Sequence, residues 1–156
     1  MRISLVLLAM AAIAARPAAA DPRPRSLVVV VAKGSKVTNL SRADLKRAFS
    51  GDTIVVNGER LVPFNYPAGT PERIAFDRVI LGMSAEQVGR FWVDRKIRGE
   101  SQAPRSLPSA LHVTKIVAKF PSAISYVPAD QVTADVVAVA IDGVLPTAAG
   151  YPIKVK

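Results

Sequence analysis

The sequence predicts an α/β fold: a layered domain with a mixed, mostly parallel sheet flanked by helices. A continuous β-branched run at residues 26–31 is typical of a strand that is buried on both faces. Strand-like and helix-like segments then alternate along the chain. The helix-like segments begin with capping residues and end near glycine or proline. Together these observations favour a sheet covered by helices.

The first residues differ from the rest and have the layout of a secretory signal peptide. Met1-Arg2 is a short positive start, residues 3–15 are an unbroken apolar stretch, and Ala18-Ala19-Ala20 offers a cleavage site of small residues. An uncleaved membrane anchor is the alternative, although the apolar stretch is shorter than the roughly 20 residues of a membrane span. We therefore expect a signal peptide at residues 1–20. One domain at residues 21–156 follows it, periplasmic or secreted, with no stable membrane anchor.

Composition indicates a basic exported domain. The chain has 156 residues, with 21 Lys and Arg against 12 Asp and Glu, one His and no Cys. Without Arg2 and Arg16 of the signal peptide, a net charge of about +7 remains. This charge suggests an anionic partner such as phosphate, whereas nucleic acid is not expected outside the cytoplasm. His112 has no second ligand at metal-binding spacing, so we expect neither a metal nor a cofactor.

The first half of the domain is predicted to hold two helices and a hairpin. Ser41 begins a helix that ends at Gly51. Strands at residues 53–56 and 61–64 flank Asn57-Gly58, a strong signal for a tight hairpin turn. The second helix begins at Thr70-Pro71-Glu72 and ends at Gly82, with Thr70 as its N-cap and proline at its first helical position. Its apolar face consists of Ile74, Phe76, Val79 and Ile80.

The second half is predicted to hold two further helices and three strands. Ser84 begins a helix that turns four residues inward: Val88, Phe91, Trp92 and Ile97. We expect Trp92 to pack in the core with Phe91 or Val88 rather than to form a binding platform. Ser109 caps another helix, which Pro121 stops. The predicted strands cover residues 123–127, 136–141 and, as an edge strand, 152–155.

No motif in the sequence indicates an enzyme. A GxSxG elbow, a Ser-x-x-Lys pair and a glycine-rich nucleotide loop are all absent. The acidic residues occur singly: Asp44 and Glu72 are interpreted as helix-start acids, and Asp77, Glu86 and Asp94 as members of solvated helix faces. We therefore do not expect catalytic residues.

The start of the second predicted helix is the candidate binding site. Ala68, Gly69 and Thr70 place unpaired backbone N–H groups at a helix N-terminus, which favours anions. Gly69 permits close approach by a ligand, and the Thr70 hydroxyl can cap the helix or donate to an oxyanion. Arg73 lies one turn further along, where it can reach the same place. The alternative is a well-capped helix without a ligand.

Several short motifs occur in an order that resembles the phosphate-binding periplasmic proteins of phosphate ABC transporters, within the type 2 periplasmic binding protein-like superfamily. The resemblance covers nearly all of the chain after the signal peptide, and it implies the fold of one lobe of such a protein. The motifs are Asn39-Leu40-Ser41, Leu45, Phe49-Ser50-Gly51, Ala68-Gly69-Thr70, Pro121 to Tyr126, Ile141 to Thr147 and Tyr151-Pro152.

The resemblance also implies which residues contact a ligand. Proteins of this family have two lobes that close on phosphate, and of their ligand-contacting positions Gly69 and Thr70 carry over. Ala68 stands where the family has a serine, and no arginine precedes the turn. Ser125 replaces a glycine. Two functions follow: a solute-binding-like domain that holds phosphate or a similar anion weakly, partnered by an ABC transporter or another envelope protein, or an interaction module that keeps the fold without a ligand.

Overall fold

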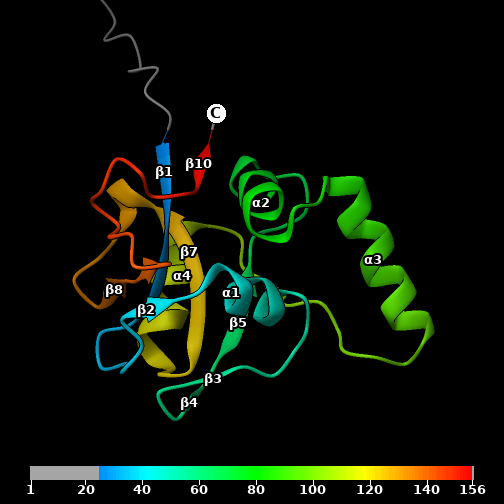
Figure 1. Cartoon of the computed structure of the whole chain (residues 1–156), viewed down its shortest axis with the longest axis horizontal. Coiled ribbons are helices and arrows are strands. Elements are labelled where there is room, and N and C mark those ends of the chain that lie inside the picture. The colour runs from blue at the N-terminus through cyan, green and yellow to red at the C-terminus, as the bar shows by residue number, and fades with distance from the viewer. Residues whose placement is uncertain (1–24, 156) are drawn as a thin grey trace, which may run out of the picture.

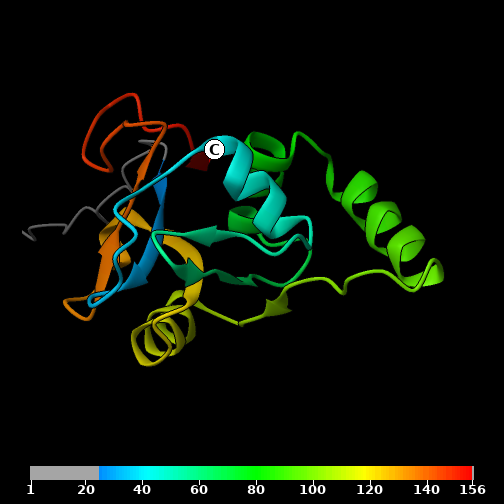
Figure 2. The same cartoon turned by 60° about the horizontal axis from the view of Figure 1, so that its bottom comes forward.

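The computed structural model describes residues 25–155, which form a mixed sheet covered on both faces by helices (Figures 1 and 2). The predicted signal peptide lies outside the described residues. Within them, no helix has the length and apolar character needed to cross a membrane. The main sheet contains β1 (Arg25–Ala32), β5 (Val62–Asn65), β6 (Arg105–Ser106), β7 (Ala123–Pro128), β8 (Val136–Ala138) and β10 (Lys154–Val155).

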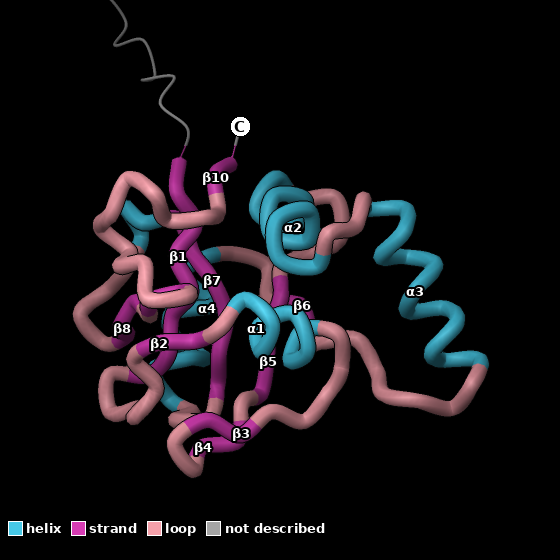
Figure 3. The backbone as a smooth tube through the Cα atoms, in the orientation of Figure 1, coloured by secondary structure: helices cyan, strands magenta, loops and turns pink. Residues whose placement is uncertain are grey.

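Helices α1 and α2 lie on one side of the sheet and α4 on the other (Figure 2). A π-helical turn continues α2, and α3 lies apart from the sheet (Figures 1 and 3). Small pairs of strands complete the fold, β2 with β9 and β3 with β4. The bounds are β2 (Asn39–Leu40), α1 (Arg42–Phe49), β3 (Val55–Val56), β4 (Glu59–Arg60), α2 (Pro71–Phe76), the π-turn (Asp77–Leu81), α3 (Ala85–Ile97), α4 (Ala110–Lys119), a 3₁₀ turn (Ala129–Gln131) and β9 (Ala140–Ile141).

The prediction of an α/β layered domain with a mixed sheet is confirmed, but parallel pairing does not predominate. The strand order is β10-β1-β7-β5-β6, with β8 also beside β1. β1 runs antiparallel to β7, β8 and β10, whereas β5 runs parallel to β6 and β7. The apolar run of β1 correctly indicated burial on both faces. Such a run carries no information on whether the neighbouring strands are parallel or antiparallel. The expectation of a mostly parallel sheet was therefore wrong.

The predicted hairpin exists but is shorter than expected. Asn57 and Gly58 adopt φ values of 51° and 81°, as a type I′ turn requires, and join β3 to β4. The predicted second strand of the hairpin instead becomes β5, which joins the main sheet beside β7. The hairpin ends early because β5 pairs with β6 and β7, where its residues gain more burial than in an exposed ribbon.

Aromatic rings join the helices to the sheet at the centre of the core. Phe76 of α2 stacks on Tyr126 of β7 with ring centroids 4.0 Å apart and planes 4° apart. The ring centroid of Phe49 of α1 lies 4.5 Å from that of Phe76. All three side chains are buried, and such pairs stabilise a core beyond the area that they bury. The cluster fixes the position of α2, and with it the loop that precedes this helix.

The motifs near the two ends of the chain contact each other. β2 pairs in parallel with β9, and Asn39 Oδ1 accepts a hydrogen bond from the Gly143 backbone N–H at 2.9 Å. The Tyr151 hydroxyl accepts from the Val29 N–H at 3.1 Å and donates to the Val139 carbonyl at 2.9 Å. These motifs therefore stabilise the fold.

Helix α3 differs from its prediction. It begins at the predicted capping box of Ser84 and Gln87, but only Val88 of the helix is buried. Ile97 is 79% exposed, so its expected inward position was wrong. Nine residues separate it from Val88, and at about 100° per residue this places it on the opposite face. Trp92 is half-buried and packs edge-on against Phe91, with ring centroids 5.0 Å apart.

Candidate anion site

The loop between β5 and α2, together with the first turn of α2, places three of the four predicted site residues in the lining of a cavity: Ala68, Gly69 and Arg73. Thr70 is the N-cap of α2, as predicted. Its hydroxyl accepts from the Arg73 N–H at 3.4 Å and donates to the Pro67 carbonyl at 3.0 Å. Since the hydroxyl proton is already engaged, Thr70 acts as a cap rather than as a donor to a ligand. Gly69 has a φ of 87°, a conformation that favours glycine.

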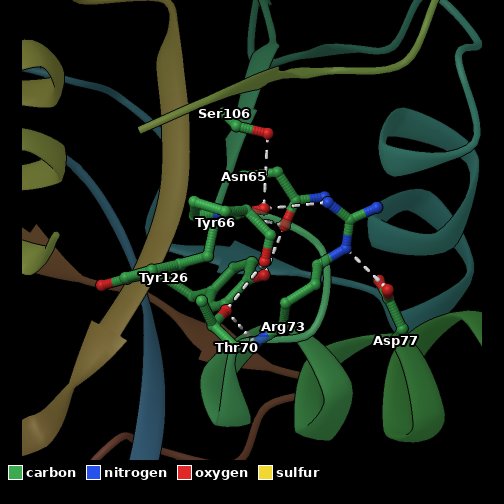
Figure 4. Close-up of polar contacts among 8 residues, drawn as sticks. Asn65, Tyr66, Thr70, Arg73, Asp77, Ser106 and Tyr126 are labelled. Carbon is green, nitrogen blue, oxygen red and sulfur yellow. Dashed lines mark hydrogen bonds and ion pairs between the residues drawn. The ribbon is translucent and has the colours of Figure 1, made fainter. Parts of the chain in front are cut away.

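Arg73 is the central residue of the site. Although its guanidinium is charged, the residue is only 7% exposed. Figure 4 shows the side chain between two acceptors: Nε donates to Asp77 Oδ2 at 2.6 Å and Nη1 donates to the Tyr66 carbonyl at 3.0 Å. Within the described residues, Nη2 makes no hydrogen bond, so it remains available to a ligand.

A cavity of about 230 Å³ lies between α2, α3 and the segment that leads into β6. Its lining includes Arg73, which supplies positive charge, and the side chains of α3 close one side. A volume of this size admits a small ion with some water. The lining residues that matter here are Ala68, Gly69, Arg73, Asp77, Trp92 and Ser106.

Asp77 also lines the cavity, contrary to its expected position on a solvated helix face. The residue is 2% exposed, and Oδ1 has no hydrogen-bond partner within residues 25–155. Burial raises the pKa of this carboxyl, and the charge of Arg73 and its hydrogen bond offset part of the increase. Arg73 and Asp77 are four residues apart on one helix, a spacing that brings opposite charges together. This spacing was the sequence signal that could have identified the pair.

Further polar groups without partners lie around this site. The Trp92 indole Nε1 and the Asn65 Nδ2 are both buried without a hydrogen-bond partner in the described part of the chain. Asn65 Oδ1 accepts from the Tyr66 N–H at 3.0 Å and from the Tyr126 hydroxyl. Ser106 Oγ donates to the Tyr66 carbonyl at 3.4 Å. Buried polar groups without partners are costly, so a ligand or water that satisfies them gains free energy.

The structure thus brings together most of the predicted site. Ala68, Gly69 and Arg73 all line the cavity, whereas Thr70 holds the helix start without lining it. Sequence reasoning missed Asp77 although its i,i+4 spacing from Arg73 was visible, and it missed Trp92 because that position depends on how α3 packs beside the π-turn that follows α2. Among residues 25–155, no group of three or more potential ligand side chains could hold a metal ion.

The fold is similar to that of phosphate ABC transporter substrate-binding proteins, as the order of the motifs predicted. An ABC-type phosphate transport receptor from Vibrio cholerae matches with a TM-score of 0.65 and 19% identity, over 80% of this chain and 49% of that one. A putative phosphate ABC transporter substrate-binding protein with bound phosphate, from Clostridium perfringens, matches with a TM-score of 0.65 and 21% identity, over 84% and 53%. PstS from Borrelia burgdorferi matches with a TM-score of 0.63 and 12% identity, over 85% and 55%.

The chain spans about half the length of these solved structures, which is consistent with one lobe of such a protein. No family model matches the chain. No curated protein matches it by sequence. At these identities the likeness concerns the fold, and the residues of the cavity must support any ligand on their own chemistry.

Proposed function

We propose that the chain is an exported solute-binding-like domain that binds phosphate or a similar inorganic oxyanion weakly, in the cavity beside α2. The observation that carries this proposal is the buried guanidinium of Arg73, whose Nη2 has no partner among the described residues and whose side chain lines the cavity. The similarity in fold to proteins described as phosphate-binding adds support.

The donors of the cavity suit an oxyanion. Arg73 Nη2 provides a charged donor, and Trp92 Nε1 is a second unpaired donor on a residue that lines the same cavity. Hydrogen bonds that involve a charged group contribute about 1.5–3 kcal/mol each. Two or three of them, less the cost of immobilising the ligand, leave about 4–6 kcal/mol. This corresponds to dissociation constants from roughly millimolar to tens of micromolar.

Asp77 adds a condition on the ligand. Its Oδ1 is buried beside the cavity without a donor. Phosphate carries a proton at neutral pH and can donate it to this oxygen, whereas sulfate carries none and meets a carboxylate. The site therefore favours a protonated oxyanion. A bare oxyanion such as sulfate binds more weakly, because it leaves the buried Asp77 Oδ1 unpaired.

Calorimetric titration of the purified protein with phosphate, sulfate and chloride at matched ionic strength tests the proposal. We expect binding of phosphate at a millimolar constant or tighter, weaker binding of sulfate and none of chloride. Arg73→Lys keeps the positive charge but removes the free Nη2, and we expect it to weaken phosphate binding about tenfold or more. Arg78→Lys, on an exposed residue of the π-turn, is the matched control. If phosphate gives no heat and no stabilisation beyond chloride, the proposal is wrong. The alternative function, an interaction module that keeps the fold without a ligand, then remains.

We also propose a location and a partner for the domain, from the sequence pattern of residues 1–20 and from the similarity in fold. The domain at residues 21–156 is placed in the periplasm or outside the cell by a signal peptide at residues 1–20, and an ABC transporter or another envelope protein is its expected partner. N-terminal sequencing of the protein from the cell envelope should find Asp21 first. Material that still begins at Met1 would favour a membrane anchor.

A further inference from the structure

The face of the sheet that α4 covers is left partly open beside β5 and β6. α4 packs chiefly on β7 and β1, and Figure 2 shows β6 to one side of it. Val62 and Phe64 alternate along β5, so both side chains point to the same face of the sheet. Val62 is 40% exposed, and Phe120 at the end of α4 is 54% exposed. Apolar surface is therefore open to solvent between α4 and the edge of the sheet.

This surface is hollowed into a groove of about 560 Å³. Sites for small molecules typically measure about 300–1,000 Å³ and are lined mainly by apolar side chains with a few polar groups. The sheet forms one wall of the groove and the end of α4 forms the other. The lining residues that matter here are Val62, Phe64, Leu107, Ile116 and Phe120, with Arg105 as the one charged residue among the described residues of the lining.

A second hollow, of about 240 Å³, adjoins the charged end of the groove. It shares Val62 and Arg105 with the groove and adds Arg60 to the lining. Both arginines are exposed, and neither forms an ion pair with another described residue. Asp52 also lines this hollow, but it pairs with Arg47 at 3.4 Å. The groove thus has an apolar length and a cationic end.

An added β-strand is a poor fit for this place. β6 is the edge strand of the sheet and has two residues. The Leu107 N–H donates to the Asn65 carbonyl at 2.7 Å, so within β6 the N–H of Ser106 is the one that faces away from β5. Pro104, just before β6, has no N–H to offer, and proline at a sheet edge opposes further pairing. A small ligand, in contrast, can use the apolar length and the cationic end.

We propose that this groove binds an amphipathic anion, a small molecule with an apolar body and one carboxylate, such as a medium-chain fatty acid. The body lies between the sheet and α4 and covers Val62 and Phe120. The carboxylate lies at Arg105, whose guanidinium can bind it through two parallel hydrogen bonds, and Arg60 adds positive charge. The groove shares Ser106 with the cavity beside α2 but neither Arg73 nor Asp77, so the two sites act independently.

Calorimetric titration of the purified protein with hexanoate, octanoate and decanoate, each below the concentration at which it forms micelles, tests the proposal. We expect affinity to rise about tenfold for each two CH₂ groups, because a longer chain buries more apolar surface. Octanol has the same chain length as octanoate without the charge, and it should bind at least about tenfold more weakly than octanoate. Octyltrimethylammonium carries the opposite charge and should not bind.

Substitutions on the surface separate the two ends of the groove without disturbing the core. Arg105→Gln should weaken octanoate binding about tenfold or more and leave octanol binding unchanged. Arg90→Gln removes one exposed arginine from α3 and is the matched control. Phe120→Ser should weaken the binding of both ligands. Leu111→Ser is its control, because Leu111 is 58% exposed on α4 and lies outside the groove.

The anion site beside α2 must be distinguished from the groove. Arg73→Lys should leave octanoate binding unchanged, and phosphate should not displace octanoate. Displacement by phosphate, or loss of octanoate binding in Arg73→Lys, would place the carboxylate in the cavity beside α2 and overturn the proposal. Equal affinities for octanoate and octanol would instead indicate a surface for an apolar protein partner, and a wild type that binds none of the three acids would leave the groove without this ligand. Either result also overturns the proposal.

Discussion

At the scale of single residues, the site depends on a buried pair of opposite charges. Arg73 and Asp77 contact each other at 2.6 Å, and each is almost fully buried. Taking such a pair out of water costs about as much as the attraction returns, so the pair is weak evidence for stability. Its free atoms, Arg73 Nη2 and Asp77 Oδ1, are arranged to give one donor and one acceptor to the same cavity. This arrangement makes a functional role the better explanation.

Asp77→Asn tests the acceptor. The amide can donate a hydrogen bond, so a ligand no longer has to bring a proton. We expect phosphate affinity to fall about tenfold or more, and sulfate affinity to rise, as calorimetric titration would measure. Asp94→Asn, an exposed acid on α3, is the control for the loss of one negative charge. An unchanged ratio of phosphate to sulfate affinity in Asp77→Asn would remove Asp77 from the site.

Residues near in sequence were predictable, and residues near only in space were not. Gly69, Thr70 and Pro71 act within one turn of chain, so their pattern predicted the helix start correctly. Trp92 joins the cavity only because α3 packs beside the π-turn that follows α2, and no local pattern contains this information. Ser125 makes the same point, because its Oγ donates to the Phe64 carbonyl at 2.9 Å. A serine is therefore accommodated where the resemblance implied a glycine.

At the scale of elements, the start of α2 and the cavity have separate roles. The Thr70 hydroxyl caps the helix, and it donates its one hydrogen bond to the Pro67 carbonyl. Thr70→Ala should therefore lower the free energy of unfolding by about 1 kcal/mol. It should change phosphate affinity by less than about twofold, because the hydroxyl has no free proton for the ligand.

Denaturant unfolding and calorimetric titration of the same variant check this prediction. Ser109→Ala removes the N-cap of α4, on the other side of the sheet, and provides a matched loss of stability. Thr70→Ser keeps the hydroxyl and should restore the stability. A large loss of phosphate affinity in Thr70→Ala, absent from Ser109→Ala, would mean that the hydroxyl contacts the ligand after all.

At the scale of the whole molecule, all three tyrosines of the chain lie in the core and connect its layers. Tyr66, Tyr126 and Tyr151 are each at most 4% exposed. Burial raises the pKa of Tyr151 to about 12 and also raises the pKa of Tyr66 and of Tyr126. The folded state therefore holds protons that the unfolded state releases near pH 10.

This difference predicts how the protein unfolds in alkali. The stabilisation from Tyr151 is complete below pH 10 and is lost as the pH rises through about 12. It amounts to about 3 kcal/mol at roughly 1.4 kcal/mol per pKa unit. Phenolate absorbance and circular dichroism, followed together against pH, should stay native past pH 10 and then change in one step. Phe120→Tyr adds a phenol at a position that is 54% exposed, and this one should ionise near pH 10 with the fold intact. A native tyrosine that ionises alongside it would show that its ring is accessible to water, and that the layers around it open without unfolding.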